Sequence, residues 1–429
     1  MTAEQVPRFA RDDTVTFLRM PGLHITSEVA PLEAVLVHTP GLELEAVTPG
    51  TREAYLYDDI IEVETAQREH RQFVAVLERF ADVYQVRGLL HEVLEKPEAR
   101  EFFVSRTMDV VPSEPLAQRL NMLPPDELVA LLIEGSEEES GPISRALNEV
   151  GYALPALPNL FFPRDIGMVV GRHAVVGSMR HGVRWTEELL IKTLFTYHPG
   201  LANDGIIYDG SEERRSNYTL EGGDVHVLRE DLLVVGFSER TSTAAIDQLG
   251  EVLFARGGVT DIIVVVMPKA PTAIHLDMIF TQVDRDLCVV YPPYFTSAER
   301  LPVLHRRRGV EGVREMPNFF AALRAVDLPM EPLFAGGAHR TTQEREQWSS
   351  ACNFVAVAPG QLIAYDRNEA TLRELETAGF RSVSANDFLM GNAAVEPGRR
   401  VVITVEGSEI VRGGGGPRCM TLPLRRAPL

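Results

Sequence analysis

Short β-branched and aliphatic runs alternate with helix-forming stretches along most of the 429-residue chain. Such runs, bounded by turn dipeptides such as Pro-Gly, are typical of strands, whereas apolar residues at helical spacing indicate amphipathic helices. The alternation predicts an α/β fold. The predicted strands are Ala34–His38, Met168–Val170, Ala174–Val176, Leu232–Val235, Ile262–Met267, Leu287–Tyr291, Phe354–Val357 and Val401–Val405. The predicted helices are Ile61–Phe80, Glu188–Thr196, Thr243–Ala255 and Ala370–Ala378.

Residues 88–150 differ from the rest of the chain because they contain helix-like pieces and no convincing strand. The acidic run Glu137-Glu138-Glu139, beside Gly-Pro, is expected to form a solvated turn. We therefore expect residues 88–150 to be a helical insertion within a single domain that spans residues 1–429. No exact repeat is visible along the chain. The helix-like pieces are Leu89–Phe103, Glu114–Leu120 and Asp126–Ile133.

The balance of charge excludes some classes of partner. The chain has 61 acidic and 42 basic residues, which gives a formal net charge of -19. Nucleic acids and anionic membranes need a positive footprint, so neither is expected as a partner. The compact basic run His305-Arg306-Arg307-Arg308 is expected to be a solvated loop.

Three cysteines, Cys288, Cys352 and Cys419, are too few for a disulfide framework and leave one without a partner. Residues 1–20 lack the basic start and apolar stretch of a signal peptide, and no apolar run is long enough to span a bilayer. A cytoplasmic location is therefore expected.

Cys419 follows a run of four glycines, Gly413–Gly416. Consecutive glycines permit backbone geometry that other residues avoid and let a ligand approach the main chain. The cysteine could thus be presented to a pocket, although its position alone is equally compatible with a buried structural cysteine.

His275 and Asp277 lie in a segment that begins by alternating apolar and polar residues, Ile274–Phe280. If this segment is a strand, both side chains share one face and suit general acid/base work beside a cation-binding carboxylate. Metal binding is the rival, but the usual His-x-His and His-Glu-x-x-His spacings are absent. Taken alone, the histidine could also be a satisfied residue of the core.

Two acidic turns, each before a predicted strand, carry Asp165 and Glu221. Either carboxylate could equally cap a turn. Together with Cys419, His275 and Asp277, however, they supply what attack on a guanidinium carbon requires. Carboxylates hold the planar cation, a thiolate adds to it, and an acid/base protonates the departing ammonia. The bound cation would also favour the thiolate form of the cysteine.

These motifs resemble those of the arginine deiminase family, nearly from end to end. Early matches are Gly22-Leu23-His24, Ser27-Glu28-Val29 and Val35–Gly41. Central matches are Pro158-Asn159, Phe162, Arg164-Asp165, Met179 with Arg184, Glu221-Gly222-Gly223-Asp224, Ser238 with Arg240-Thr241, and His275-Leu276-Asp277. Late matches are Glu344–Trp348, Asn353, Tyr365–Asn368 and Arg418–Thr421. Residues 300–335 match nothing in the family's pattern.

The resemblance implies a pentein-type five-bladed α/β propeller of ββαβ units with an inserted small helical domain. It also implies hydrolysis of free L-arginine to L-citrulline and ammonia. Cys419 would attack the guanidinium carbon, and His275 would protonate leaving ammonia and then activate water. Asp165 and Asp277 would clamp the guanidinium, with Glu221 beside His275. Neither a metal nor an organic cofactor is implied, and the family forms dimers and higher assemblies.

The resemblance further places Arg184 and Arg240 at positions that pair with the substrate α-carboxylate, and Asn159 and Phe162 at pocket-lining positions. Two such arginines would disfavour a decarboxylated substrate such as agmatine, which would leave them unpaired. The alternative is that both arginines form only structural ion pairs. Some family members carry a gating arginine five residues before the catalytic cysteine, where this chain has Gly414.

Two other functions remain open at this point. An amidinotransferase, or a deiminase of another guanidino acid, would use the same cysteine, histidine and carboxylates. A non-catalytic arginine-binding or adhesion protein would be expected to have lost Cys419, His275 or Glu221, and all three are present.

Overall fold

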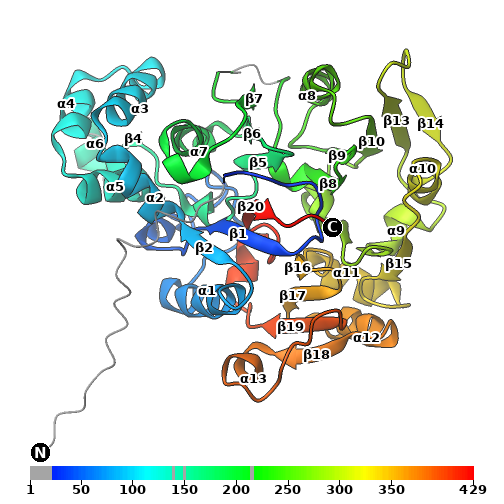
Figure 1. Cartoon of the computed structure of the whole chain (residues 1–429). Coiled ribbons are helices and arrows are strands. Elements are labelled where there is room, and N and C mark those ends of the chain that lie inside the picture. The colour runs from blue at the N-terminus through cyan, green and yellow to red at the C-terminus, as the bar shows by residue number, and fades with distance from the viewer. Residues whose placement is uncertain (1–21, 138–140, 148–150, 213–216) are drawn as a thin grey trace, which may run out of the picture.

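The structure of the chain, a computed structural model, describes residues 22–137, 141–147, 151–212 and 217–429. Strands and helices alternate along it, so the predicted α/β fold is confirmed (Figure 1). None of the described helices combines the length and the apolar character that crossing a membrane requires. The strands are β1 (Leu32–Val37), β2 (Asp82–Gln85), β3 (Ser136–Glu137), β4 (Tyr152–Leu154), β5 (Gly167–Val170), β6 (His173–Val176), β7 (Ile206–Asp209), β8 (Val225–Arg229), β9 (Leu232–Phe237), β10 (Asp261–Val266), β11 (Phe280–Gln282), β12 (Leu287–Val290), β13 (Val303–Arg307), β14 (Arg314–Met316), β15 (Glu331–Phe334), β16 (Val355–Ala358), β17 (Gln361–Tyr365), β18 (Arg381–Ser384), β19 (Val401–Val405) and β20 (Leu422–Arg426).

The helices lie between these strands, and α2 to α6 gather at one side of the molecule (Figure 1). The α-helices are α1 (Val63–Leu77), α2 (Val86–Leu94), α3 (Pro97–Val110), α4 (Glu114–Met122), α5 (Pro125–Glu134), α6 (Pro142–Leu147), α7 (Trp185–Tyr197), α8 (Thr243–Arg256), α9 (Pro292–Phe295), α10 (Phe319–Ala325), α11 (Arg340–Trp348), α12 (Glu369–Thr377) and α13 (Ala385–Leu389). Short 3-10 turns include η3 (Pro158–Phe161), η4 (Gly182–Arg184), η6 (Gly222–Asp224), η8 (Leu276–Met278) and η9 (Ile410–Gly413).

One connection pattern recurs in the sheets. Two antiparallel strands are followed in the chain by a helix, and a later strand then pairs in parallel with the second strand of the pair. Within the described residues this holds for β5-β6-β7, β8-β9-β10, β11-β12-β15 and β16-β17-β19. The chain ends complete a fifth example, because β20 pairs antiparallel with β1 and β1 pairs parallel with β2. The C-terminal strand that follows Cys419 is thus fixed by the N-terminal strand.

Helix α8 and strand β10 show how the local sequence sets these elements. Ser242 caps the helix by accepting a hydrogen bond from the backbone N–H of Ala245. The helix ends at Gly257, whose φ of 94° lies in the left-handed region that glycine tolerates. Strand β10 pairs with β9 on one side and β13 on the other, and its continuous apolar run suits this buried central position.

The basic run His305–Arg308 was predicted as a loop, and that prediction is wrong. Most of it belongs to β13, where the ring of His305 lies 2.6 Å from a carboxylate oxygen of Asp261. The guanidinium of Arg306 packs over the ring of Phe254 at 5.3 Å. His305 thus has an acidic partner on the neighbouring strand β10, and Arg306 has an aromatic partner on helix α8, neither of which a count of local charge reveals.

The stretch Leu89–Phe103 was predicted as one helical piece, but the structure breaks it into α2 and α3. Pro97 begins α3, in the first helical turn where proline's missing N–H costs nothing. Residues 88–150 also contain the two-residue strand β3, contrary to the expectation of no strand. Of the predicted acidic turn, Glu138 and Glu139 lie outside the described residues.

The carboxylate of Glu69, buried in α1, fastens the segment that leads to the glycine run. It accepts hydrogen bonds from the hydroxyl of Ser408 at 2.6 Å and from the backbone N–H groups of Glu409 and Ile410, each at 3.0 Å. These donors would otherwise be left unpaired as the chain enters η9.

We expect Glu69→Ala to lower the free energy of unfolding by about 2–4 kcal/mol, because several donors lose their acceptor inside the protein. Urea unfolding followed by circular dichroism measures this loss. Glu64→Ala, on an exposed position of the same helix, is the matched control and should cost about 0.5 kcal/mol or less. Equal stability of the two variants would contradict the fastening role of Glu69.

Candidate active site

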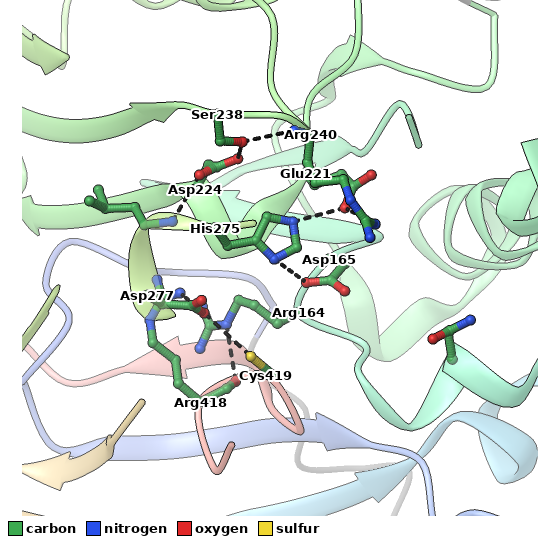
Figure 2. A network of polar contacts seen from close by, with 12 residues as sticks. Arg164, Asp165, Glu221, Asp224, Ser238, Arg240, His275, Asp277, Arg418 and Cys419 are labelled. Carbon is green, nitrogen blue, oxygen red and sulfur yellow. Dashed lines mark hydrogen bonds and ion pairs between the residues drawn. The ribbon is translucent and has the colours of Figure 1, made fainter. Parts of the chain in front are cut away.

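A narrow pocket lies where several distant segments of the chain meet. All nine site residues predicted from the sequence are buried here, and seven of them line the pocket. The other two, Glu221 and Asp277, lie directly behind it and contact pocket residues. The lining residues are Leu56, Asn159, Phe162, Asp165, Arg184, Arg240, Ile274, His275, Met278, Gly413, Gly414, Gly415 and Cys419. Figure 2 shows Asp165 and Cys419 converging with His275 and Asp277, which share one segment.

His275 was predicted to lie on a strand face with Asp277, and the strand is wrong. His275 precedes the 3-10 turn η8, whose first N–H donates to Oδ1 of Asp224 at 2.9 Å. Nε2 of His275 lies 2.8 Å from Oε2 of Glu221, and Nδ1 lies 3.7 Å from Oδ1 of Asp165. The ring packs against Gly223, where a Cβ atom would lie 2.6 Å away, so glycine is needed there.

The carboxylates around His275 decide its protonation. Burial alone would lower its pKa, but the charge of Asp165 and the hydrogen bond with Glu221 raise it to about 9. Although burial opposes it, the charges of Arg240 and His275 hold the pKa of Glu221 below its usual range. At neutral pH the site therefore contains an imidazolium beside a carboxylate.

The glycine run before Cys419 is packed and not open. Added Cβ atoms at Gly413 and Gly415 would lie within 3 Å of the rings of Phe161 and Phe162. Gly414 has a φ of 86°, which an L-residue rarely adopts. The close fit of backbone to aromatic rings sets the direction in which the chain enters the turn that carries Cys419.

The sulfur of Cys419 lies 3.6 Å from Oδ2 of Asp277. Burial, and then the charges of Asp277 and Asp165, raises the pKa of the Cys419 thiol well above its usual value. At neutral pH Cys419 is therefore a neutral thiol. Asp277 itself is held by Arg418, whose Nη1 donates to Oδ2 at 2.8 Å.

Arg184 has strong acidic partners in the pocket. Its guanidinium donates to Asp165 at 2.8 Å and to both carboxylate oxygens of Glu187, at 3.0 and 2.7 Å. Arg240 is less well satisfied. Its Nη1 lies 3.4 Å from Glu221, and its Nε lies 2.7 Å from Glu239 without the alignment of a hydrogen bond.

Asp165, Glu221 and His275 offer ligand atoms within 4.8 Å of one another, the one cluster of metal-ligating groups among the described residues. The two carboxylates are already paired with Arg184 and Arg240, and the raised pKa of His275 favours its protonated form. A metal ion would have to displace a proton and face two guanidinium groups, so the charge balance disfavours it.

The sequence matches the family model described as arginine deiminase over residues 53–426. The chain belongs to the arginine deiminase family. Arginine deiminase of Listeria welshimeri is 33% identical over 426 residues, covering 95% of this chain and 99% of that protein. Arginine deiminase of Streptococcus gordonii is 31% identical, covering 94% of this chain and 98% of that protein. The family and the enzyme class predicted from the sequence are confirmed.

Solved structures similar to this member of the arginine deiminase family share its fold. SxtG, an amidinotransferase from Microseira wollei, has a TM-score of 0.54 at 14% identity, covering 95% of this chain and 98% of that one. DDAH from Pseudomonas aeruginosa, complexed with citrulline, has a TM-score of 0.50 at 14% identity, covering 91% and 99%. Both are pentein-fold α/β proteins, so the likeness is consistent with a pentein fold in this family member.

Three features of the pocket of this family member were missed from the sequence. Leu56 lines the pocket with a φ of 68°, a strained value for leucine that no local pattern announces. Glu187, three residues after Arg184 on the next turn, could have been paired with it from helical spacing. Asn353 contacts the sulfur of Cys419 and was noted only as part of a matched motif.

In ligand-free protein we expect the imidazole of His275 to titrate near pH 9. Its folded pKa exceeds the unfolded value of about 6.5, so the charged form stabilises the fold fully below pH ~6.5. That stability is lost as pH rises through about 9. Glu221→Gln should lower the midpoint by about one unit or more, because a neighbouring negative charge is removed.

Side-chain ¹H–¹⁵N NMR of the histidines measures this titration, with the His275 signal assigned from a His275→Gln variant. Glu239→Gln, which removes a carboxylate that contacts Arg240 and not His275, should shift the midpoint less. A wild-type midpoint at or below pH 6.5 would show that the carboxylates do not govern His275.

Proposed function

We propose that this chain hydrolyses free L-arginine to L-citrulline and ammonia through a covalent intermediate on Cys419. The observation that carries the proposal is the pocket itself. A buried cysteine, a histidine and three carboxylates meet in a member of the arginine deiminase family. Carboxylates bind a guanidinium, the thiol attacks its carbon, and the histidine transfers protons.

The substrate cation would activate the nucleophile. In the ligand-free pocket the charges of Asp165 and Asp277 oppose ionisation of the Cys419 thiol. A guanidinium held between these two carboxylates would cancel their charge and place a positive group beside the sulfur. Thiolate formation is thereby coupled to substrate binding: the thiol proton is released to solvent as the cation binds, and the thiolate adds to the guanidinium carbon.

His275 is placed to move the protons of both half-reactions. Protonated at neutral pH, it would donate to the departing nitrogen as the carbon–nitrogen bond breaks, releasing ammonia and leaving an S-alkylthiouronium on Cys419. The neutral imidazole would then take a proton from water, which attacks that carbon and expels the thiolate as citrulline forms. Glu221 keeps the ring oriented through its 2.8 Å contact with Nε2.

Arg184 and Arg240 are proposed to bind the substrate α-carboxylate, with Asn159 and Phe162 forming the pocket wall. Arg240 supports this best, because its Nε lacks a hydrogen-bond acceptor although it is buried. Arg184 holds Asp165 in the ligand-free pocket, so an incoming guanidinium would compete with it for that carboxylate. Its exchange from Asp165 to the α-carboxylate would satisfy both groups.

Gly414 stands where some family members carry a gating arginine. Arg412 does not replace that arginine, because its guanidinium pairs with Asp59 and Glu409. We therefore propose that access to this pocket is not gated by an arginine of the cysteine loop.

The recurring strand–strand–helix–strand connection supports a five-bladed propeller of ββαβ units, with β20, β1, α1 and β2 forming the unit that joins the chain ends. We propose a single catalytic domain over residues 1–429, with residues 88–150 inserted in it as the helices α2 to α6.

A homo-oligomeric state, a dimer or higher, is proposed from the family resemblance alone. The three cysteines are all unpaired and buried, which fits the reducing cytoplasm that we propose as the location. The proposed reaction requires neither a metal nor an organic cofactor, because the thiol, the imidazole and water supply its chemistry.

We expect equal amounts of citrulline and ammonia from L-arginine, and Cys419→Ala should reduce turnover by roughly 10³-fold or more because the attacking atom is gone. Colorimetric citrulline and enzymatic ammonia assays measure both products. Cys288→Ala, which removes another buried cysteine, is the matched control and should retain activity. Full turnover without Cys419 would refute the covalent route, and product that depends on an added amine would indicate amidino transfer.

Selectivity for the α-carboxylate is expected to follow Arg240. Wild-type kcat/KM for agmatine should be about 10²–10³-fold below that for L-arginine, since agmatine leaves the buried arginines unpaired. Arg240→Met should reduce this ratio to roughly tenfold or less. The ratio is the readout, because losing the contact with Glu221 lowers turnover of both substrates. An unchanged ratio would assign Arg240 a structural role only.

A further inference from the structure

Asn353 makes four hydrogen bonds at the nucleophile and is 1% exposed. Its side-chain oxygen accepts from the backbone N–H groups of Arg418 at 2.9 Å and Cys419 at 3.1 Å. Its amide nitrogen donates to the sulfur of Cys419 at 3.1 Å and to the carbonyl of Asp277 at 3.2 Å. One side chain thus contacts the backbone and the sulfur of the same cysteine, together with the segment that carries Asp277.

The orientation of this carboxamide is fixed by chemistry. Backbone N–H groups can only donate, so the side-chain atom facing Arg418 and Cys419 must be the oxygen. The NH₂ group then necessarily faces the sulfur and the carbonyl of Asp277. A donor aimed at sulfur stabilises the thiolate more than the thiol, because hydrogen bonds to charged acceptors are stronger.

The glycine run is shaped to let Asn353 reach this position. A Cβ atom at Gly416 would lie 2.8 Å from both Cβ and Oδ1 of Asn353. Any larger residue at 416 would push the carboxamide away from the turn.

The segment that carries Asn353 is itself braced. The backbone N–H of Asn353 donates to the carbonyl of Ser350, a non-glycine residue with a φ of 61°. Gln347, one turn earlier, donates from its side chain to the carbonyls of Thr272 and Met278, which flank the His275 segment. A buried segment with a strained backbone and supporting hydrogen bonds is typical of a position where a side chain is held in place for function.

We propose that Asn353 is a positioning residue for the nucleophile, fixing the Cys419 turn and favouring the thiolate through its N–H···S hydrogen bond. The proposal rests on the proposed function of Cys419. The hydrogen bond from Asn353 favours the thiolate, whereas the charges of Asp277 and Asp165 oppose ionisation of the thiol. Other charged or titratable groups near the sulfur are Arg418, the preceding residue, His275 across the pocket and Tyr365 on β17.

The test is the pH dependence with which Cys419 of the ligand-free protein reacts with iodoacetamide, followed by mass spectrometry of the peptide that contains it. Asn353→Asp keeps an oxygen for the two backbone donors and replaces the NH₂ with an acceptor. We expect alkylation about tenfold slower at a fixed pH below the pKa of the thiol, which corresponds to an increase of about one unit in the pKa of Cys419. We also expect kcat to fall about 10²-fold, with KM changing only a few-fold.

Asn353→Ala, which removes the donor without adding charge, should shift the alkylation profile in the same direction. Asn368→Asp is the matched control, because Asn368 is also buried, donates to the carbonyl of Ser349 and does not contact the cysteine turn. Its profile should match that of the wild type. Alkylation profiles of both Asn353 variants that coincide with wild type would overturn the proposal.

If neither variant folds, the unaltered protein still decides the question. The side-chain amide signal of Asn353 in a ¹H–¹⁵N spectrum should shift with the titration of Cys419, because its N–H faces the sulfur. An amide chemical shift that stays constant while Cys419 titrates would overturn the proposal. Failure of the proposed function is distinguishable, because alkylation and the amide shift report on the thiol whether or not citrulline forms.

Discussion

The buried ion pairs of Arg418 hold the site together. Its guanidinium, 1% exposed, contacts both carboxylate oxygens of Glu28 at 3.2 Å and Oδ2 of Asp277 at 2.8 Å. It also donates to the carbonyl of Val225 at 2.9 Å. One side chain thus ties an N-terminal segment, the start of β8 and the Asp277 turn to the residue before Cys419. Removing one partner of such a buried group would leave a charge uncompensated, at a cost of roughly 3–5 kcal/mol.

The ion pairs of the pocket also set the protonation of Cys419 and His275. The carboxylates proposed to bind the guanidinium, Asp165 and Asp277, form buried ion pairs with Arg184 and Arg418. The charges of Asp277 and Asp165, with burial, raise the pKa of the Cys419 thiol, whereas those of Asp165 and Glu221 raise the pKa of His275. A substrate cation would oppose the first effect, whereas Glu221, 2.8 Å from Nε2, would still favour the protonated imidazole. Thiolate attack followed by proton donation requires this combination.

Prediction from sequence succeeded where local pattern carried the information. All eight predicted strands coincide with observed strands to within one or two residues, because buried parallel strands are apolar runs bounded by turns. It failed where a distant partner decides the conformation. His305 belongs to a strand because Asp261 faces it across the sheet, and His275 precedes a 3-10 turn because Asp224 accepts the first N–H of that turn. The repeated ββαβ connection could not be recognised as a sequence repeat either, because the repeated units share their strand pairing and not their amino-acid sequence.

Asn353 shows the same limit at the site. It lies 66 residues from Cys419 in the chain, and nothing in its neighbourhood distinguishes it from any buried asparagine. The related sequence feature was Gly416, which with its neighbouring glycines indicated a main chain that a ligand could approach closely. In the structure these glycines admit Phe161, Phe162 and the Asn353 carboxamide to within van der Waals contact of the backbone. The absence of side chains therefore serves close packing, and close packing fixes the sulfur without further reorganisation when substrate binds.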